Sequence, residues 1–219
     1  MPAEQAVELP DEVSDELGAC LGIPGITAHR AVFADGSVTG KTILVHGVLG
    51  AVGSLAAQLA RWGGATVIGT ITRERDLELV NPAVAHAVAL DQPDPVDAIR
   101  SNAPDGVARI IEVAFSDNAD LDAAVAADDT VIAAYASRHD RPEIPFWPML
   151  FANLTIRLLG SDDFPTAAKH QAAADLTTAA REGALSVPVG DPLPLEHIAK
   201  AHDRVDAGAR QRVLVKIPH

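Results

Sequence analysis

The stretch that decides the fold reads Thr42-Ile43-Leu44-Val45-His46-Gly47-Val48-Leu49-Gly50-Ala51-Val52-Gly53. Its first four residues form a short, β-branched apolar run, which is typical of a buried strand. The three glycines mark a tight turn, and the apolar spacing of residues 55–62 predicts a helix that ends at Gly63-Gly64. Residues 65–68 are again apolar, so the sequence predicts a strand, a crossover helix and a second, parallel strand.

The same alternation continues along the rest of the chain. Further strands are predicted at 87–89, 108–113, 130–134, 154–159, 185–187 and 213–217, and further helices at 95–101, 119–127, 167–181 and 195–205. Two helical stretches, 11–21 and 26–33, precede the first strand, and Ser14 is the expected N-cap of the first. The pattern indicates the α/β class, with a doubly wound parallel (Rossmann) sheet. We expect a helical lead-in over 1–40, a dinucleotide-binding domain over 41–190 and a C-terminal helix–strand return over 191–219.

Composition excludes several kinds of function. The 219 residues contain 17 Lys and Arg against 30 Asp and Glu, a formal net charge of -13. Nucleic acids and anionic membranes need a basic face, so neither is expected as a partner. The single cysteine, Cys20, excludes an intramolecular disulfide and a cysteine-built zinc site, and the histidines show no ligand spacing, so no metal is expected. Without a membrane span or a signal peptide in the sequence, a cytoplasmic protein is expected.

The glycine turn has the position of a dinucleotide fingerprint, after the first strand and before the first helix. Gly50 would let the backbone approach a pyrophosphate, and Gly53 would let the helix pack closely on the strand. The N–H groups of Ala51 and Val52, with the helix dipole, favour an anion there. Val48 replaces the first glycine of G-x-G-x-x-G, and Gly47 stands one place earlier. The alternative is a glycine turn kept only for tight packing.

The end of the second strand indicates the type of dinucleotide. NAD sites carry a carboxylate there for the ribose 2′-hydroxyl, whereas this chain has none at that point. Two hydroxyl and two arginine side chains stand there instead: Thr70, Thr72, Arg73 and Arg75. These groups suit a 2′-phosphate and favour NADPH over NADH. The alternative is that the arginines are solvated and pair with the acids next to them.

Four segments together resemble a known family. They are Leu17 to Ala28, His46 to Gly53, Gly69-Thr70 and Pro145 to Arg157. In order, they are similar to medium-chain dehydrogenases/reductases, above all to the zinc-free quinone oxidoreductases related to zeta-crystallin. The resemblance covers essentially the whole chain, which would start where the family's N-terminal GroES-like domain ends. A truncated, a naturally shortened and a split enzyme are all compatible with this.

The resemblance also implies roles for individual residues. The cofactor-binding positions are Thr27, Gly47, Val48, Leu49, Gly50, Ala51, Val52, Gly53, Thr70, Thr72, Arg73, Arg75, Ala114, Tyr135 and Ala136. Residues 50–53 would hold the pyrophosphate, and the threonines and arginines from 70 to 75 would face the adenosine 2′-phosphate. Thr27 would sit near the nicotinamide, Ala114 on the adenosine side, and Tyr135 with Ala136 beside the nicotinamide ribose. Asp76 and Asp91 depart from the family's lysine and tyrosine, which weakens the case for NADPH. The strand 154–159 would pair across a homodimer axis.

The implied activity is NADPH-dependent hydride transfer to a quinone or an activated C=C bond. An enoyl reductase domain acting on acyl thioesters and a non-catalytic nucleotide-binding dimeric module are the alternatives. No catalytic side chain is predicted. His46 is interpreted as a strand end rather than a base, and Cys20 as a core residue. For Phe146, Trp147 and Phe151 we favour packing beneath a Pro-rich loop over a quinone-facing wall or a dimer surface.

Overall fold

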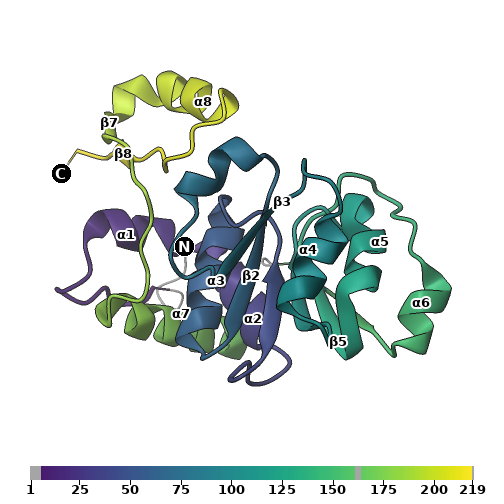
Figure 1. Ribbon diagram of the computed structural model, residues 1–219. Coiled ribbons are helices and arrows are strands. Elements are labelled where there is room, and N and C mark those ends of the chain that lie inside the picture. The colour runs from purple at the N-terminus through teal and green to yellow at the C-terminus, as the bar shows by residue number, and fades with distance from the viewer. Residues whose placement is uncertain (1–5, 161–163, 219) are drawn as a thin grey trace.

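A six-stranded parallel sheet forms the centre of the molecule (Figure 1). The computed structural model describes residues 6–160 and 164–218. The strands are β1 (Thr42–Val45), β2 (Thr66–Ile71), β3 (His86–Ala89), β4 (Val107–Glu112), β5 (Ala126–Ala134) and β6 (Thr155–Leu158). Their order in the sheet is β3-β2-β1-β4-β5-β6, and every pairing is parallel. This order confirms the predicted doubly wound fold.

Helices cover both faces of the sheet (Figure 1). The helices are α1 (Asp15–Cys20), α2 (Ile23–Phe33), α3 (Ala51–Trp62), α4 (Pro95–Asn102), α5 (Phe115–Val125), α6 (Phe146–Phe151) and α7 (Thr166–Arg181). Along β1, Ile43 and Val45 join one buried apolar cluster with α2, α3 and α7, whereas Leu44 joins a second cluster with α4 and α5. Successive side chains of a strand point to opposite faces, so a continuous apolar run serves both cores.

The C-terminal segment forms a small unit that stands apart from the six-stranded sheet (Figure 1). It contains β7 (Leu193–Pro194), a 3-10 turn (Leu195–His197), α8 (Ile198–Asp206) and β8 (Val215–Lys216). β7 and β8 pair in parallel. An ion pair of 2.5 Å between Arg210 Nη2 and Asp76 Oδ2 joins this unit to η2 (Glu74–Leu79), the 3-10 helix after β2.

The first helix has the N-cap that the sequence predicts, whereas the second helix begins earlier than predicted. Ser14 is confirmed as the N-cap of α1, because its Oγ accepts a hydrogen bond from Leu17 N at 3.2 Å. Helix α2 begins at Ile23 rather than at 26, since Pro24 lies in the first turn, where a missing N–H costs nothing. Within the described ranges, no helix combines the length and the apolar composition that a membrane span needs.

Two predictions near the carboxyl end of the chain are wrong or too long. Residues 185–187 form no strand, because the side chain of Gln58 satisfies the backbone of Ser186. Ser186 N donates to Gln58 Oε1 at 2.7 Å, and Gln58 Nε2 donates to Ser186 O at 3.0 Å. The strand predicted at 213–217 is reduced to the two residues of β8.

The aromatic cluster does not pack beneath a loop. Residues 146–151 form the short helix α6, and the side chains of Phe146, Trp147 and Phe151 are 54%, 63% and 78% exposed. The rings of Trp147 and Phe151 stack with centroids 6.0 Å apart. The favoured interpretation from the sequence is therefore wrong, and these aromatic rings form a surface patch.

Candidate functional site

The carboxyl ends of β2, β1 and β4 meet at the point where the strand order reverses. Val45, the last residue of β1, lies beside Gly69 of β2 and Ile111 of β4. In doubly wound sheets, ligands bind outside the carboxyl ends of the strands at this switch point. The glycine turn lies at this edge of the sheet.

The turn has the backbone geometry that its glycines predict. Gly47 has φ +65°, a left-handed backbone conformation that is sterically unfavourable for residues with a Cβ atom. Its carbonyl accepts a hydrogen bond from Gly50 N at 2.8 Å. A Cβ at Gly53 would lie 2.8 Å from Gly47 C and 2.9 Å from His46 O, and closer still to Gly47 O. The close helix–strand packing expected at Gly53 is therefore present.

Val48 occupies the place of the missing first glycine without disturbing the turn. Its side chain is 1% exposed, and its N–H donates to Thr70 O at 3.1 Å. A Cβ at Gly69 would lie 2.7 Å from Val48 Cγ1. The valine side chain therefore fits inward against a position on β2 that itself has no side chain.

The start of α3 can accept an anion. Gly50 is its N-cap, is exposed, and provides no side chain to cap the helix. The first N–H groups of a helix have no partner within the helix and carry the positive end of its dipole. The turn therefore fits a pyrophosphate on both steric and electrostatic grounds.

The arginines after β2 are available for a ligand. Thr72, Arg73 and Arg75 are all exposed. In the described part of the chain, neither arginine has a carboxylate oxygen within 4.0 Å. The expected alternative, in which Arg73 and Arg75 pair with the neighbouring acids, is not seen.

Both acids that depart from the family pattern already have partners. Asp76 pairs with Arg210 of the C-terminal unit, as described above. Asp91 Oδ1 accepts a hydrogen bond from Glu74 N at 2.9 Å, at the start of η2. The negative charge of Asp76 is therefore partly compensated, which reduces its repulsion of a phosphate.

Ala114, Tyr135 and Ala136 follow β4 and β5 at the same edge of the sheet. Ala114 and Tyr135 are half-buried after β4 and β5, and Ala136 is exposed. Tyr135 N donates to Glu112 O at 3.0 Å, and Phe115 N donates to Ala136 O at 3.2 Å, so the ends of β4 and β5 are joined. Burial, with the charge of Glu112, raises the pKa of the Tyr135 phenol. Thr27 lies in α2 with its side chain 5% exposed.

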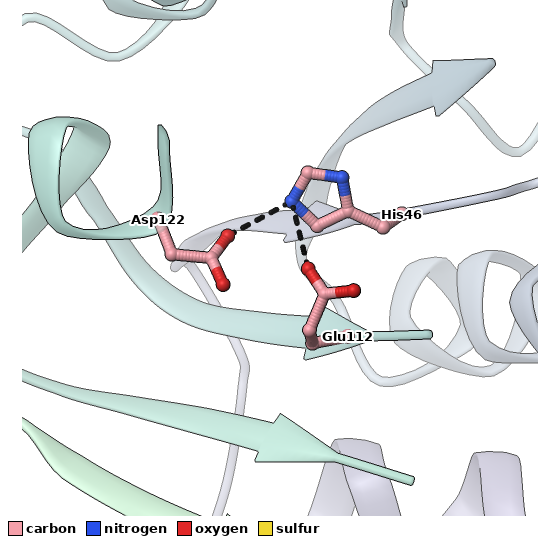
Figure 2. Close-up of side chains that lie close together, drawn as sticks. All are labelled: His46, Glu112 and Asp122. Atoms are coloured by element: carbon pink, nitrogen blue, oxygen red, sulfur yellow. Dashed lines mark hydrogen bonds and ion pairs between the residues drawn. The ribbon is translucent and has the colours of Figure 1, made fainter. Parts of the chain in front are cut away.

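A buried polar network that the sequence did not predict adjoins the turn, and Figure 2 shows three of its members, His46, Glu112 and Asp122. His46 Nε2 lies 3.0 Å from Asp122 Oδ1 and 3.4 Å from Glu112 Oε2. On the other side of the ring, His46 Nδ1 lies 2.9 Å from Thr70 Oγ1. All four side chains are at most 1% exposed. The Thr70 hydroxyl, predicted to face a 2′-phosphate, is thus buried and bonded to His46.

The network determines the charge on its members. Burial disfavours a charged His46 ring, but the hydrogen bond to Asp122 and the charges of Glu112 and Asp122 outweigh it and raise the pKa of His46. Burial also raises the pKa of the Glu112 carboxyl, against the opposing effect of His46. Asn118 Nδ2 and Ala114 N donate to Glu112, whereas Asp122 Oδ2 has no hydrogen-bond partner among the residues that the structure describes. A positively charged His46 beside two carboxyl groups is the state that this arrangement favours.

Sequence reasoning missed this network because its residues come from separate elements. Glu112 closes the apolar strand β4, and Asp122 lies on α5, where acids are usually solvated. The sequence did contain one sign of a buried polar site, which is the Glu112 carboxylate at the end of a buried apolar run. The ligand atoms of His46, Glu112 and Asp122 lie within 4.8 Å of one another, a spacing that could also hold a metal ion.

The chain is similar to curated quinone oxidoreductases over most of its length. It is 30% identical to the quinone oxidoreductase of Pongo abelii over 207 residues, which is 92% of this chain and 62% of that protein. It is 31% identical to that of Mus musculus, with the same coverage. The chain thus spans less than two thirds of the length of these relatives. No protein-family model matches it.

Solved structures show the same fold. A structure of mycobacterial Rv1454c complexed with NADPH has a TM-score of 0.82 and 24% identity, and it is matched over 98% of this chain and 68% of that one. The JamJ enoyl reductase in its apo form has a TM-score of 0.82 and 19% identity, over 100% of this chain and 67% of that one. At these identities the likeness establishes the fold alone.

Proposed function

Because the chain belongs to the medium-chain dehydrogenase/reductase superfamily, in its quinone oxidoreductase branch, we propose that it binds NADPH and serves hydride transfer to a quinone or an activated C=C bond. The observation that carries this proposal is the glycine turn at the switch point, with its left-handed Gly47 and the uncapped start of α3. The superfamily is one of oxidoreductases. The activity of this chain is our inference from the turn and from its relatives.

The protein's part in such a reaction is binding and orientation. Bound NADPH supplies the hydride itself. The N–H groups of Ala51 and Val52 would hold the pyrophosphate, and Gly53 would keep α3 close to the sheet. Thr27 and Tyr135, with Ala136, would border the nicotinamide end, and Ala114 the adenosine side. An electron-poor acceptor takes hydride directly, so no protein nucleophile is required.

The preference for NADPH is supported by Arg73 and Arg75. Both are exposed and without a carboxylate partner among the described residues, while Asp76 is paired with Arg210. A structural relative, mycobacterial Rv1454c, was solved with NADPH. Two free guanidinium groups can bind a 2′-phosphate with charge-assisted hydrogen bonds, which NADH cannot accept.

Replacing both arginines, Arg73→Ala with Arg75→Ala, is expected to weaken NADPH binding about tenfold or more and to leave NADH binding nearly unchanged. Charge-assisted contacts of this kind are worth roughly 1.5–3 kcal/mol. Fluorescence titration with both dinucleotides measures the effect. The matched control is Arg61→Ala with Arg181→Ala, which removes the same charge at exposed positions in the last turns of α3 and α7. Equal losses for NADPH and NADH would show that Arg73 and Arg75 do not distinguish the two.

A binding and turnover experiment tests the function. NADPH should raise the melting temperature of the chain, and NADPH oxidation should follow on adding a quinone or an enone. Turnover with an acyl-thioester enoyl substrate instead would favour the enoyl reductase alternative. The JamJ enoyl reductase, which has the same fold, is the reason to test it. Binding without turnover of any acceptor would favour a non-catalytic nucleotide-binding module. No thermal shift with either dinucleotide would contradict all three.

We further propose that β6 and α6 form a homodimer surface. β6 is an edge strand of the sheet, and an unpaired edge is a template for pairing with a second strand. The exposed rings of Phe146, Trp147 and Phe151 lie on the helix just before it, and Leu158 at its end is 76% exposed. An apolar patch beside an open sheet edge is typical of an interface.

Introducing charge into this surface with Phe151→Glu and Leu158→Lys is expected to convert a dimer into a monomer at micromolar concentration. The exposed apolar area would no longer be buried by a partner without also burying the new charges. Size-exclusion chromatography with light scattering gives the mass. The control is Ile23→Glu, at a 64% exposed apolar residue that belongs to α2 and to neither β6 nor α6. A dimer that persists in the double variant would place the interface elsewhere.

A further inference from the structure

The buried network that adjoins the turn is not used by the chemistry proposed above. Its members come from four different elements: His46 follows β1, Thr70 belongs to β2, Glu112 ends β4 and Asp122 lies on α5. Placing three ionisable groups at 1% exposure or less is costly unless each has a defined partner. A network with this cost calls for a physical explanation.

Thr70 connects the network to the glycine turn. Its Oγ1 contacts His46 Nδ1 at 2.9 Å and accepts a hydrogen bond from Gly47 N at 3.3 Å. The carbonyl of Thr70 accepts from Val48 N at 3.1 Å. The first two N–H groups of the turn therefore both bond to one residue, and its hydroxyl is oriented by the His46 ring.

The orientation of Gly47 is then passed on to the helix start. Gly47 O accepts from Gly50 N at 2.8 Å, and it is one of the backbone atoms that closely approach Gly53. The N–H that the Thr70 hydroxyl holds belongs to the His46–Gly47 peptide, whose carbonyl oxygen, His46 O, also closely approaches Gly53. Gly47 O belongs to the next peptide, whose N–H on Val48 donates to Thr70 O. A rotation of either peptide would therefore move a carbonyl that packs against Gly53. The carboxyl groups of Glu112 and Asp122 thus contact the His46 ring, and the ring contacts the Thr70 hydroxyl. That hydroxyl in turn accepts the hydrogen bond from Gly47 N.

We propose that His46, held by Asp122 and Glu112, is a positioning residue for dinucleotide binding, which acts through Thr70 on the Gly47 peptide. This inference depends on the proposed function. His46 is 1% exposed and its ring points toward Asp122 and Glu112 (Figure 2), so it does not exchange a proton with a ligand. The 3.0 Å between Nε2 and Asp122 Oδ1 is an ordinary N–H···O hydrogen-bond length, so a proton is enough to explain the contact.

The decisive variant is Thr70→Val, which removes the hydroxyl at nearly constant volume. NADPH and NADH should both bind roughly three- to tenfold more weakly, because the turn serves the pyrophosphate that they share. Thr70→Ser keeps the hydroxyl and should restore affinity to within about twofold. In the ligand-free chain, the Gly47 amide should exchange its hydrogen faster in Thr70→Val than in Thr70→Ser.

Two further variants separate positioning from a general loss of stability. Thr130→Val removes a hydroxyl that is equally buried and donates to Val107 O at 2.6 Å, where β4 begins. It should reduce stability and leave both affinities unchanged. His46→Asn should weaken binding in the wild-type background and by less than about twofold more in the Thr70→Val background, since both act through one contact.

Four outcomes would overturn the inference. A loss confined to NADPH in Thr70→Val would mean that the hydroxyl contacts the 2′-phosphate instead. Unchanged affinity in Thr70→Val would overturn the inference alone and leave the proposed function intact. Affinity that changes after treatment with EDTA would mean that a cation holds the ring. Failure of the unmodified chain to bind either dinucleotide would overturn the proposed function and this inference with it.

Discussion

Replacing Gly53 with alanine is expected to abolish measurable binding of both dinucleotides and to lower the free energy of unfolding by about 3 kcal/mol. The new Cβ would lie 2.8 Å from Gly47 C and 2.9 Å from His46 O. Both are backbone atoms, which cannot swing aside as a flexible side chain can. Helix α3 must therefore move away from the turn, and the N–H groups proposed to hold the pyrophosphate move with it.

Urea unfolding gives the loss of stability, and fluorescence titration with NADPH and NADH gives the loss of affinity. Gly160→Ala is the matched control, because a Cβ there meets no atom of the described residues within 4 Å and the backbone is not left-handed. It should change neither quantity by a measurable amount. Normal affinity in Gly53→Ala would show that close packing at this position is not needed for binding.

The fold could be predicted from the sequence because local and global signals agree. Ile43, Leu44 and Val45 of β1 are consecutive apolar residues, so they predict a strand buried on both faces, and the structure gives Thr42–Val45 without change. The glycine turn follows because glycine accepts the left-handed backbone at position 47 without the steric cost that a side chain adds. Predictions of single elements failed where side chains distant in the sequence decide the local structure. The strand predicted at 185–187 is absent because Gln58 of α3 forms the hydrogen bonds of the Ser186 backbone.

The candidate site could be predicted only in part, for the same reason. The turn is contiguous in the sequence, so its role follows from spacing. The network is not, because the register of β1, β2 and β4 and the packing of α5 bring His46, Thr70, Glu112 and Asp122 together. Periodicity indicates which face a residue occupies, but it does not indicate which buried polar group it will meet.

The second large effect is expected for His46→Ala, which should lower the free energy of unfolding at pH 7 by about 3–5 kcal/mol. Glu112 and Asp122, both fully buried, would lose the positive charge between them. Chemical denaturation measures the change. His139→Ala, at an exposed histidine, should shift stability by no more than about 0.5 kcal/mol.

The wild-type protein should also lose stability as the pH rises. The pKa values of His46 and Glu112 are both raised in the folded state, so these two groups bind more protons in the folded chain than in the unfolded one, whereas burial lowers the pKa of His29 and acts in the opposite direction. The contribution of Glu112 is fully present below its ordinary pKa of 4.5 and is lost above it, and that of His46 is fully present below 6.5 and lost above it. Glu112→Gln should therefore flatten the fall in unfolding free energy as the pH rises above 4.5. An unchanged slope would show that Glu112 is not the group that titrates.

A rescue experiment separates the loss of charge from the loss of volume in His46→Ala. Removing the ring also leaves a cavity, which alone destabilises a core. Adding Glu112→Gln and Asp122→Asn to His46→Ala neutralises the two carboxyl groups and leaves the cavity. Recovery of about half of the lost stability is expected if unpaired buried charge dominates, because such charge costs more than the missing contacts. No recovery would mean that His46 stabilises the turn by filling space, and the charged network would then have no part in holding it.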